Sequence, residues 1–133
     1  MKAKIGLLGT AAMLALAIAA SAVAADPSLG IERKSSLDGG VVTIVFEYSC
    51  DWQSAALVID VTQKRDVTGT TVSTDIVCDG TMKTLAVEVF GEGDGGQPAA
   101  FKHGPASVDA ELVGCSPECG LSLPATREIR ITG

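Results

Sequence analysis

The chain has 133 residues, a formal net charge of −6 and an isoelectric point of about 4.6. This length is typical of one domain and too short for two ordinary ones with a leader. The acidic balance argues against nucleic-acid binding, which needs clustered Lys and Arg to neutralise phosphates, and the ten basic residues form no long cluster.

The first residues predict a secretory signal peptide. Two lysines precede an apolar run over residues 5–20, and small residues follow over 21–25, which is the layout of such a leader. Cleavage after Ala24 or Ala25 leaves one domain over residues 26–133, with a charge of about −8. No later stretch has the roughly 18 apolar residues of a membrane-spanning helix, so we expect a secreted, extracellular protein with no membrane span.

The first half of the domain predicts three strands. Residues 28–35 are half polar and favour a first edge strand, which the Asp38-Gly39-Gly40 turn signal follows. Residues 41–50 and 55–64 alternate between apolar and polar side chains, as half-buried strands do. Their expected inward positions are Val42, Ile44, Phe46, Tyr48 and Cys50, then Leu57, Ile59 and Val61.

The middle of the chain predicts a hairpin. Residues 70–78 and 81–90 both alternate, and Asp79-Gly80 between them is a strong two-residue turn signal. We therefore expect these two strands to pair directly. Their expected inward positions are Val72, Thr74 and Ile76 in the first strand, and Leu85, Val87 and Val89 in the second.

The last third predicts an exposed loop and two further strands. Residues 91–98 hold four glycines and two acids, too flexible and polar to offset their ordering entropy. Residues 106–112 alternate, with Ala106, Val108, Ala110 and Leu112 as the expected inward positions. A short closing strand over 125–132 starts after Pro124, with Ile129 and Ile131 inward. About seven short strands without a helical period predict an all-β fold, an antiparallel immunoglobulin-like β-sandwich, with a small barrel as the alternative.

Four cysteines in a small exported domain indicate disulfides before metal binding or catalysis. Three pairings are possible. Cys115 and Cys119 lie in the tight GCSPECG loop, which favours a local bridge and leaves Cys50 for Cys78. Trp52 follows Cys50 by two residues instead of lying midway between the bridged cysteines, so the antibody subtype of the fold is not predicted.

One set of motifs resembles a known group of proteins. It comprises Tyr48-x-Cys50, Val61-x-Gln63, Val77-Cys78-Asp79-Gly80 and Phe101-x-x-Gly104-Pro105-Ala106-x-Val108-x-Ala110. Together these resemble small uncharacterised β-sandwich proteins exported by actinobacteria, which implies a secreted sandwich and no activity. A fainter likeness, in size, export and two disulfides, is to the neocarzinostatin-type apoproteins, which hold a chromophore in an immunoglobulin-like cleft.

Candidate site residues are few. His103 is the only histidine, so neither a catalytic triad nor a multi-histidine metal site is available. Cys115 and Cys119 with His103 have donor types for copper or zinc, but export favours the disulfide. Glu92 and Asp94 offer oxygens for calcium without the spacing of an EF-hand. Trp52 either packs over the adjacent disulfide or stands exposed as a contact residue.

The sequence thus predicts a non-enzymatic secreted module, without cofactor or metal, that binds a protein or cell-surface component through loops. The candidate binding residues are Trp52, Glu92, Asp94 and His103. One alternative is a small-molecule carrier with a cleft between the sheets. Another is a hydrolase, which requires two ionisable side chains converging in a concavity.

Overall fold

A computed structural model of the protein describes residues 26–64 and 66–133. The predicted signal peptide lies outside the described residues. In chain order the elements are β2 (Ser28–Asp38), β3 (Val41–Ser49), β4 (Ser54–Gln63), β5 (Val67–Ser73), β6 (Lys83–Val89), the 3-10 turn η1 (Asp94–Gly96), β7 (Gly104–Cys115) and β8 (Cys119–Thr132). The prediction of an all-β protein with seven strands is confirmed.

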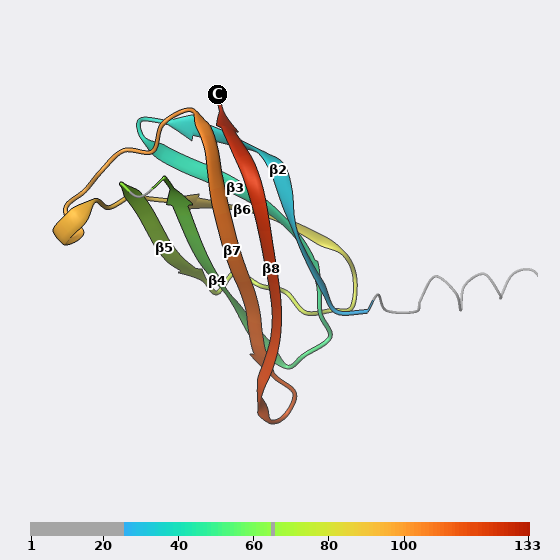
Figure 1. The fold of residues 1–133 in the computed structure, drawn as a ribbon. Coiled ribbons are helices and arrows are strands. Elements are labelled where there is room, and N and C mark those ends of the chain that lie inside the picture. The colour runs from blue at the N-terminus through green and yellow to red at the C-terminus, as the bar shows by residue number, and fades with distance from the viewer. Residues whose placement is uncertain (1–25, 65) are drawn as a thin grey trace, which may run out of the picture.

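The seven strands form one sheet that curls into a half-barrel (Figure 1), in the order β5-β4-β7-β8-β2-β3-β6. All neighbours are antiparallel except β2 and β8, which pair in parallel over Lys34, Ser35 and Ser36. The prediction of a two-sheet antiparallel sandwich is therefore wrong. Strand β2, expected at an edge, instead joins the two halves of the chain within one sheet.

A break in the register of β2 explains how it serves both neighbours. Its pairing with β3 shifts between Ile31 and Ser35, and only the part after this shift also pairs with β8. Arg127 Nη1 donates a hydrogen bond of 2.9 Å to the Ile31 carbonyl, and Ser35 Oγ donates one of 3.2 Å to the Arg130 carbonyl. Such a bulge bends a strand and increases its twist, so the sheet turns at this point.

The inside of the curl is filled by one apolar core to which every strand contributes. The predicted inward positions of β3, β4, β7 and the end of β8 are confirmed as buried. They are Val42, Ile44, Phe46, Tyr48 and Cys50; Leu57, Ile59 and Val61; Ala106, Val108, Ala110 and Leu112; and Ile129 and Ile131. Phe101, which lies between η1 and β7, is also buried and is not part of any strand.

The predicted hairpin between residues 70–78 and 81–90 is wrong. Strand β5 ends at Ser73, residues 74–82 contain no strand, and β5 and β6 occupy opposite edges of the sheet. The phase predicted for β5 is also wrong, because Val67 and Gly69 are buried whereas Val72 is 57% exposed. The inward phase of β6 is confirmed by its half-buried Leu85 and Val87 and fully buried Val89.

Strands β7 and β8 form a long hairpin, which we call the arm and whose tip points downward in Figure 1. Strand β4 pairs with β7 as far as Cys115. Strand β8 starts at Cys119 and not after Pro124. Proline is tolerated here because β8 pairs with β2 only from Arg130 onward, so its earlier part has one free edge. The two predicted disulfides, Cys50–Cys78 and Cys115–Cys119, are both confirmed, and the second closes the tip of the arm.

Candidate functional site

The two edge strands of the sheet approach each other where the half-barrel almost closes. We call the space between residues 67–75 and residues 83–92 the seam. At one end the seam is shut, because the Thr68 amide donates to the Glu92 carbonyl at 2.9 Å and the Glu92 amide donates to the Thr68 carbonyl at 2.6 Å. Gly69 permits this approach, since a Cβ there would lie 2.6 Å from the Phe90 carbonyl oxygen.

The other end of the seam is open. Extending the register of the antiparallel Thr68–Glu92 pair along both strands sets Val72 opposite Glu88 and Ser73 opposite Val87. These residues are not paired, and they line a groove of about 560 Å³ together with Asp75 and Leu85. The two strand edges therefore begin as a pair and separate into a groove.

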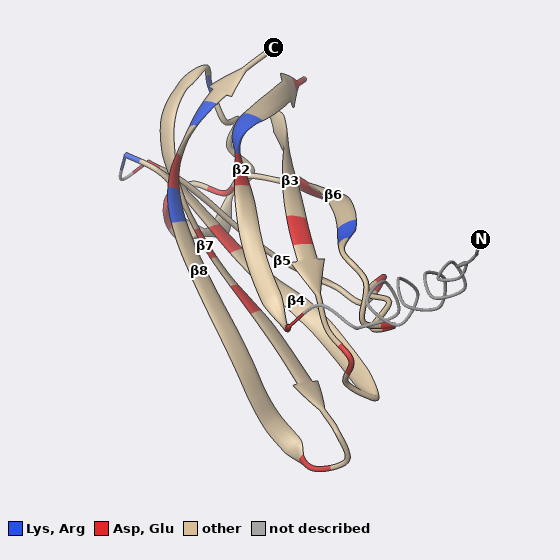
Figure 2. Cartoon of the chain, turned by 90° about the vertical axis from the view of Figure 1, so that its right-hand side faces the viewer, with Lys and Arg blue, Asp and Glu red and all other residues tan. Residues whose placement is uncertain are grey.

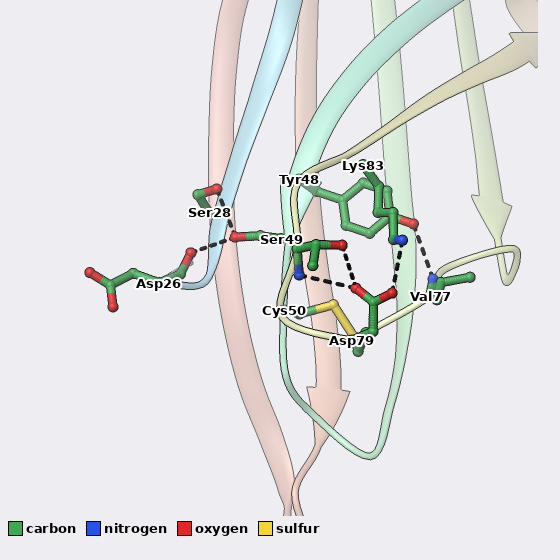
Figure 3. The surroundings of a disulfide bond; sticks show 10 residues. Asp26, Ser28, Tyr48, Ser49, Cys50, Val77, Asp79 and Lys83 are labelled. Carbon is green, nitrogen blue, oxygen red and sulfur yellow. Dashed lines mark hydrogen bonds and ion pairs between the residues drawn. A yellow bond between two sulfur atoms is a disulfide. The ribbon is translucent and has the colours of Figure 1, made fainter. Parts of the chain in front are cut away.

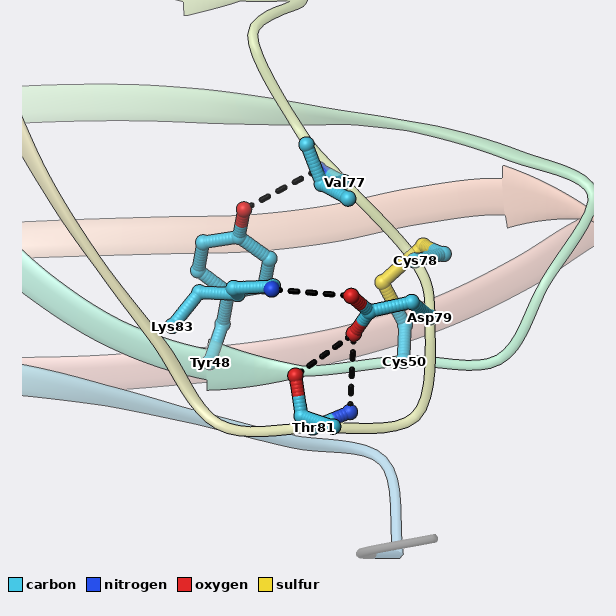
Figure 4. A network of polar contacts seen from close by, with 7 residues as sticks. All are labelled: Tyr48, Cys50, Val77, Cys78, Asp79, Thr81 and Lys83. Atoms are coloured by element: carbon cyan, nitrogen blue, oxygen red, sulfur yellow. Dashed lines mark hydrogen bonds and ion pairs between the residues drawn. A yellow bond between two sulfur atoms is a disulfide. The ribbon is translucent and has the colours of Figure 1, made fainter.

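Contacts at the end of β3 hold the seam open. The disulfide ties Cys78 to Cys50, and the Val77 amide donates to the Tyr48 hydroxyl at 3.0 Å (Figure 4). The Gly80 amide donates to the Cys50 carbonyl at 2.8 Å. The chain must leave β5 after Ser73 to reach these partners. It therefore cannot continue along β6 as the hairpin that the sequence predicts.

The Asp79-Gly80 turn is part of the same anchor. Asp79 Oδ1 accepts hydrogen bonds from the Thr81 amide at 3.0 Å and the Thr81 hydroxyl at 2.6 Å, while Lys83 Nζ lies 2.8 Å from Asp79 Oδ2 (Figure 4). The hydrogen bond from Lys83, followed by those from Thr81, holds the pKa of the Asp79 carboxyl well below its usual range. The chain therefore turns at Asp79-Gly80 as the sequence predicts, but this turn does not join two paired strands.

These contacts predict that the free energy of unfolding decreases in acid. Folding lowers the pKa of Asp79, so the ionised carboxyl adds to the free energy of unfolding. This stabilisation is fully present above the unfolded pKa of about 3.9 and is lost as the pH falls through the lower pKa of the folded state. Asp79→Asn should therefore be less stable than the wild type near neutral pH, with the difference vanishing in strong acid. Urea unfolding across that range measures it, and Asp51→Asn controls for net charge. A difference unchanged down to about pH 2 would contradict this role.

The first described residues are tied to the same end of the sheet. Ser49 Oγ donates to the Asp26 carbonyl and lies 3.2 Å from Ser28 Oγ, next to the Cys50–Cys78 disulfide (Figure 3). Ser49 is fully buried, so these partners satisfy a hydroxyl that water does not reach. The start of the described chain is therefore fixed to the end of β3, beside the disulfide that anchors residues 74–82.

Exposed large apolar side chains concentrate in the segment that runs from the end of β5 to the end of β6, both of which border the seam. Among residues 26–64 and 66–133, the large apolar residues with more than half of their surface exposed are Val72, Val77, Met82 and Phe90. All four lie within residues 72–90, which comprise the end of β5, the connecting segment and β6. Apolar groups held in solvent are a common mark of interaction surfaces.

The predicted site residues do not converge. Trp52 is half-buried and packs against the core, with its ring so close to Gly114 that a Cβ there would collide with it. Glu92 uses its backbone to shut the seam, and its side chain is exposed, as is Asp94 in η1. His103 is exposed just after Lys102, whose amide and carbonyl are both bonded to the buried Gln63 side chain at 2.8 Å. Within residues 26–64 and 66–133, no group of three metal-ligating side chains comes together.

The outer face of β4 and β7 is acidic, as the red bands in Figure 2 show. Asp60 and Asp109 are direct cross-strand partners, an arrangement of like charges that destabilises a sheet. Thr70 Oγ1 donates to Asp60 at 2.7 Å and Thr126 Oγ1 donates to Asp109 at 2.8 Å. These hydroxyls offset the repulsion, so the two carboxylates have donors within the sheet.

The comparisons with known proteins leave the family open: no family model matches the chain, and no curated protein matches it. The resemblance to exported actinobacterial proteins stays a prediction. Among the described residues, no helix has the length and apolar character needed to cross a membrane.

Proposed function

We propose that the protein is a secreted, non-enzymatic binding module that attaches to another protein or to a cell-surface component. The observation that carries this proposal is the exposure of four large apolar side chains within residues 72–90, Val72, Val77, Met82 and Phe90, of which Val72 lines the open groove of the seam. Two disulfides and a buried core support secretion and a rigid scaffold for such a surface.

The proposed binding surface lies at the seam and not in the loops that the sequence favours. The 91–98 loop contributes Gly91 and Glu92 to the closed end of the seam and nothing to its open part, and the Cys115–Cys119 loop lies at the tip of the arm, away from the seam in Figure 1. Large apolar side chains usually supply more binding energy than exposed acids, because burying them removes apolar surface from water. We therefore assign the contact to the seam.

The carrier alternative would need a site other than the cleft between two sheets that the sequence predicts for it. A cleft between two sheets has no counterpart in a single sheet, and the inside of the curl is occupied by the core. The described grooves lie at the surface, at the seam, at the arm and beside the 91–98 loop. The groove at the open part of the seam is the one that we assign to partner binding.

Affinity capture tests the proposal. The tagged domain, residues 26–133, is used as bait against the medium and the surface fraction of the cells that produce it, and captured proteins are quantified by mass spectrometry. Truncating two exposed contact residues should cost about 1 kcal/mol or more each, so Val72→Ser with Phe90→Ser should reduce the captured partner about tenfold or more. Both sites are exposed, so stability should stay within about 0.5 kcal/mol.

The matched control is a double change in the loop at the tip of the arm, Ser116→Ala with Glu118→Ala. It should leave capture unchanged, because this loop is remote in the sheet from β6. Failure of the wild-type bait to enrich any component reproducibly would contradict the proposed function. Equal loss in the seam variant and the arm variant would contradict the assigned surface.

A further inference from the structure

The open part of the seam has the features of a site for an added β-strand. Strand β6 pairs only with β3, so alternate N–H and C=O groups over residues 84–88 point to an edge with no strand beside it. The closed end demonstrates that this side of the sheet accepts strand-like pairing, because Glu92 already bonds Thr68 through both backbone groups. An extended segment in the groove would continue that pattern.

Two apolar side chains on the inner side of the groove are only partly covered by the protein. Val89 at the closed end is fully buried, whereas Leu85 and Val87, on the same inward phase, are only half-buried. Their β3 partners on that phase, Phe46 and Ile44, are fully buried. A strand added to β6 would place every second side chain over Leu85 and Val87 and remove their apolar surface from water.

The outer rim of the groove has a defined charge. Glu88 and Asp75 are exposed carboxylates in its lining, and that lining contains no Lys or Arg. Opposite charges on directly paired strand positions stabilise a sheet, and like charges destabilise it. The groove therefore favours a strand whose outward side chains are basic.

The strand cannot be supplied by β5. Continued along the register of the Thr68–Glu92 pair, β5 would set Asp75 opposite Leu85 on the inward phase, which places a carboxylate against apolar side chains. The Cys50–Cys78 disulfide also draws the chain away from that path. A second copy is disfavoured because it brings the same acidic rim, and because β5 borders the groove on its other side.

We propose that the seam binds an extended segment of another protein, about five residues long, as an eighth strand antiparallel to β6. Its apolar side chains face inward onto Leu85 and Val87, and its basic side chains face outward toward Glu88. This inference rests on the proposed binding function and names the chemistry of the partner: a strand of alternating apolar and basic residues.

Synthetic peptides test this mode directly. The probe is a fluorescent heptapeptide of alternating lysine and valine with blocked ends, titrated onto residues 26–133 and followed by anisotropy. It should bind, a glutamate–valine heptapeptide should bind at least about fivefold more weakly, and the lysine–valine peptide N-methylated at each internal residue should not bind. Equal binding of the basic and acidic peptides, or binding of the N-methylated one, would overturn the proposal.

A charge reversal locates the site. Glu88→Lys should weaken the lysine–valine peptide about fivefold and strengthen the glutamate–valine peptide, whereas Glu118→Lys, the same charge change at the tip of the arm, should alter neither by more than about twofold. Bound peptide should protect backbone amides within residues 84–88 from hydrogen exchange. Protection confined to other strands, or equal effects of the two variants, would refute this location.

Two outcomes separate this inference from the function on which it rests. If affinity capture yields a seam-dependent partner and the peptides do not bind, the strand mode fails and the binding module stands. If the protected amides instead result from a concentration-dependent dimer in analytical ultracentrifugation, the occupant is a second copy and the proposal is wrong.

Discussion

Replacing both Cys50 and Cys78 with alanine is expected to lower the free energy of unfolding by about 3 to 4 kcal/mol. The bridge spans 28 residues in sequence, so its loss frees a long loop in the unfolded chain. Cys50 is also fully buried, and its truncation leaves a small void in the core. Such a loss is a large fraction of the 5 to 15 kcal/mol typical of natural domains. Urea denaturation at equilibrium measures it.

The second disulfide provides the matched control. Cys115 and Cys119 are separated by four residues and close only the tip of the arm, so their replacement with alanine should cost about 2 kcal/mol. Only the Cys50–Cys78 variant should also speed hydrogen exchange over residues 74–82, since only that bridge anchors the segment to β3. If the short bridge proved as costly as the long one, the anchoring role of Cys78 would be refuted.

Phe101→Ala should destabilise the protein by about 3 to 5 kcal/mol, the usual cost of truncating a buried phenylalanine. Phe101 is 2% exposed, and its ring packs against the backbones of Gly69 and Gly91, where added Cβ atoms would lie 3.1 and 3.2 Å from it. Its amide also donates to the Gly40 carbonyl at 3.0 Å. The residue therefore supports the closed end of the seam from inside.

Phe90 offers a control of the same chemical type. It is 65% exposed, so Phe90→Ala should change stability by no more than about 0.5 kcal/mol. Thermal and urea unfolding of the two variants should differ accordingly. Comparable losses at the two positions would contradict the assignment of Phe101 to the core and of Phe90 to the surface.

Alternating apolar residues were enough to predict most strands and their inward faces. In β3, β4 and β7 the inward side chains are aliphatic or aromatic, and most of their neighbours are polar or small, with Val45 and Val58 as exceptions, so the two-residue period is recognisable. Strand β5 breaks this rule. Its inward phase contains Gly69, which is needed for the close approach to Phe90, and its clearest apolar residue, Val72, points to solvent.

The arrangement of the strands was beyond the sequence pattern. Asp79-Gly80 has the composition of a hairpin turn, but its carboxylate is bonded to Thr81 and Lys83, and its Cys78 neighbour is bridged to β3. The bridge to Cys50, 28 residues away, decides where the turn lies, and local spacing does not encode it. The parallel pairing of β2 with β8, which turns two expected sheets into one, likewise depends on a bulge between Ile31 and Ser35.

The candidate site was missed for a related reason. The sequence points to Trp52, Glu92, Asp94 and His103 because rare and charged residues in loops are common in binding sites. The seam is instead made of ordinary strand residues, such as Leu85, Val87 and Glu88, whose role depends on β6 being an edge. Four exposed large apolar residues within residues 72–90 were the available signal, but exposure is known only once the fold is known.

The central claim, a half-barrel whose seam is open along β6, is tested most directly by residue-resolved amide hydrogen exchange of the free protein. Along residues 84–88 we predict alternation: amides bonded to β3 exchange slowly, and the intervening amides, at the free edge, exchange fast. Uniformly slow exchange across residues 84–88 would mean that another strand covers this edge and would contradict the account.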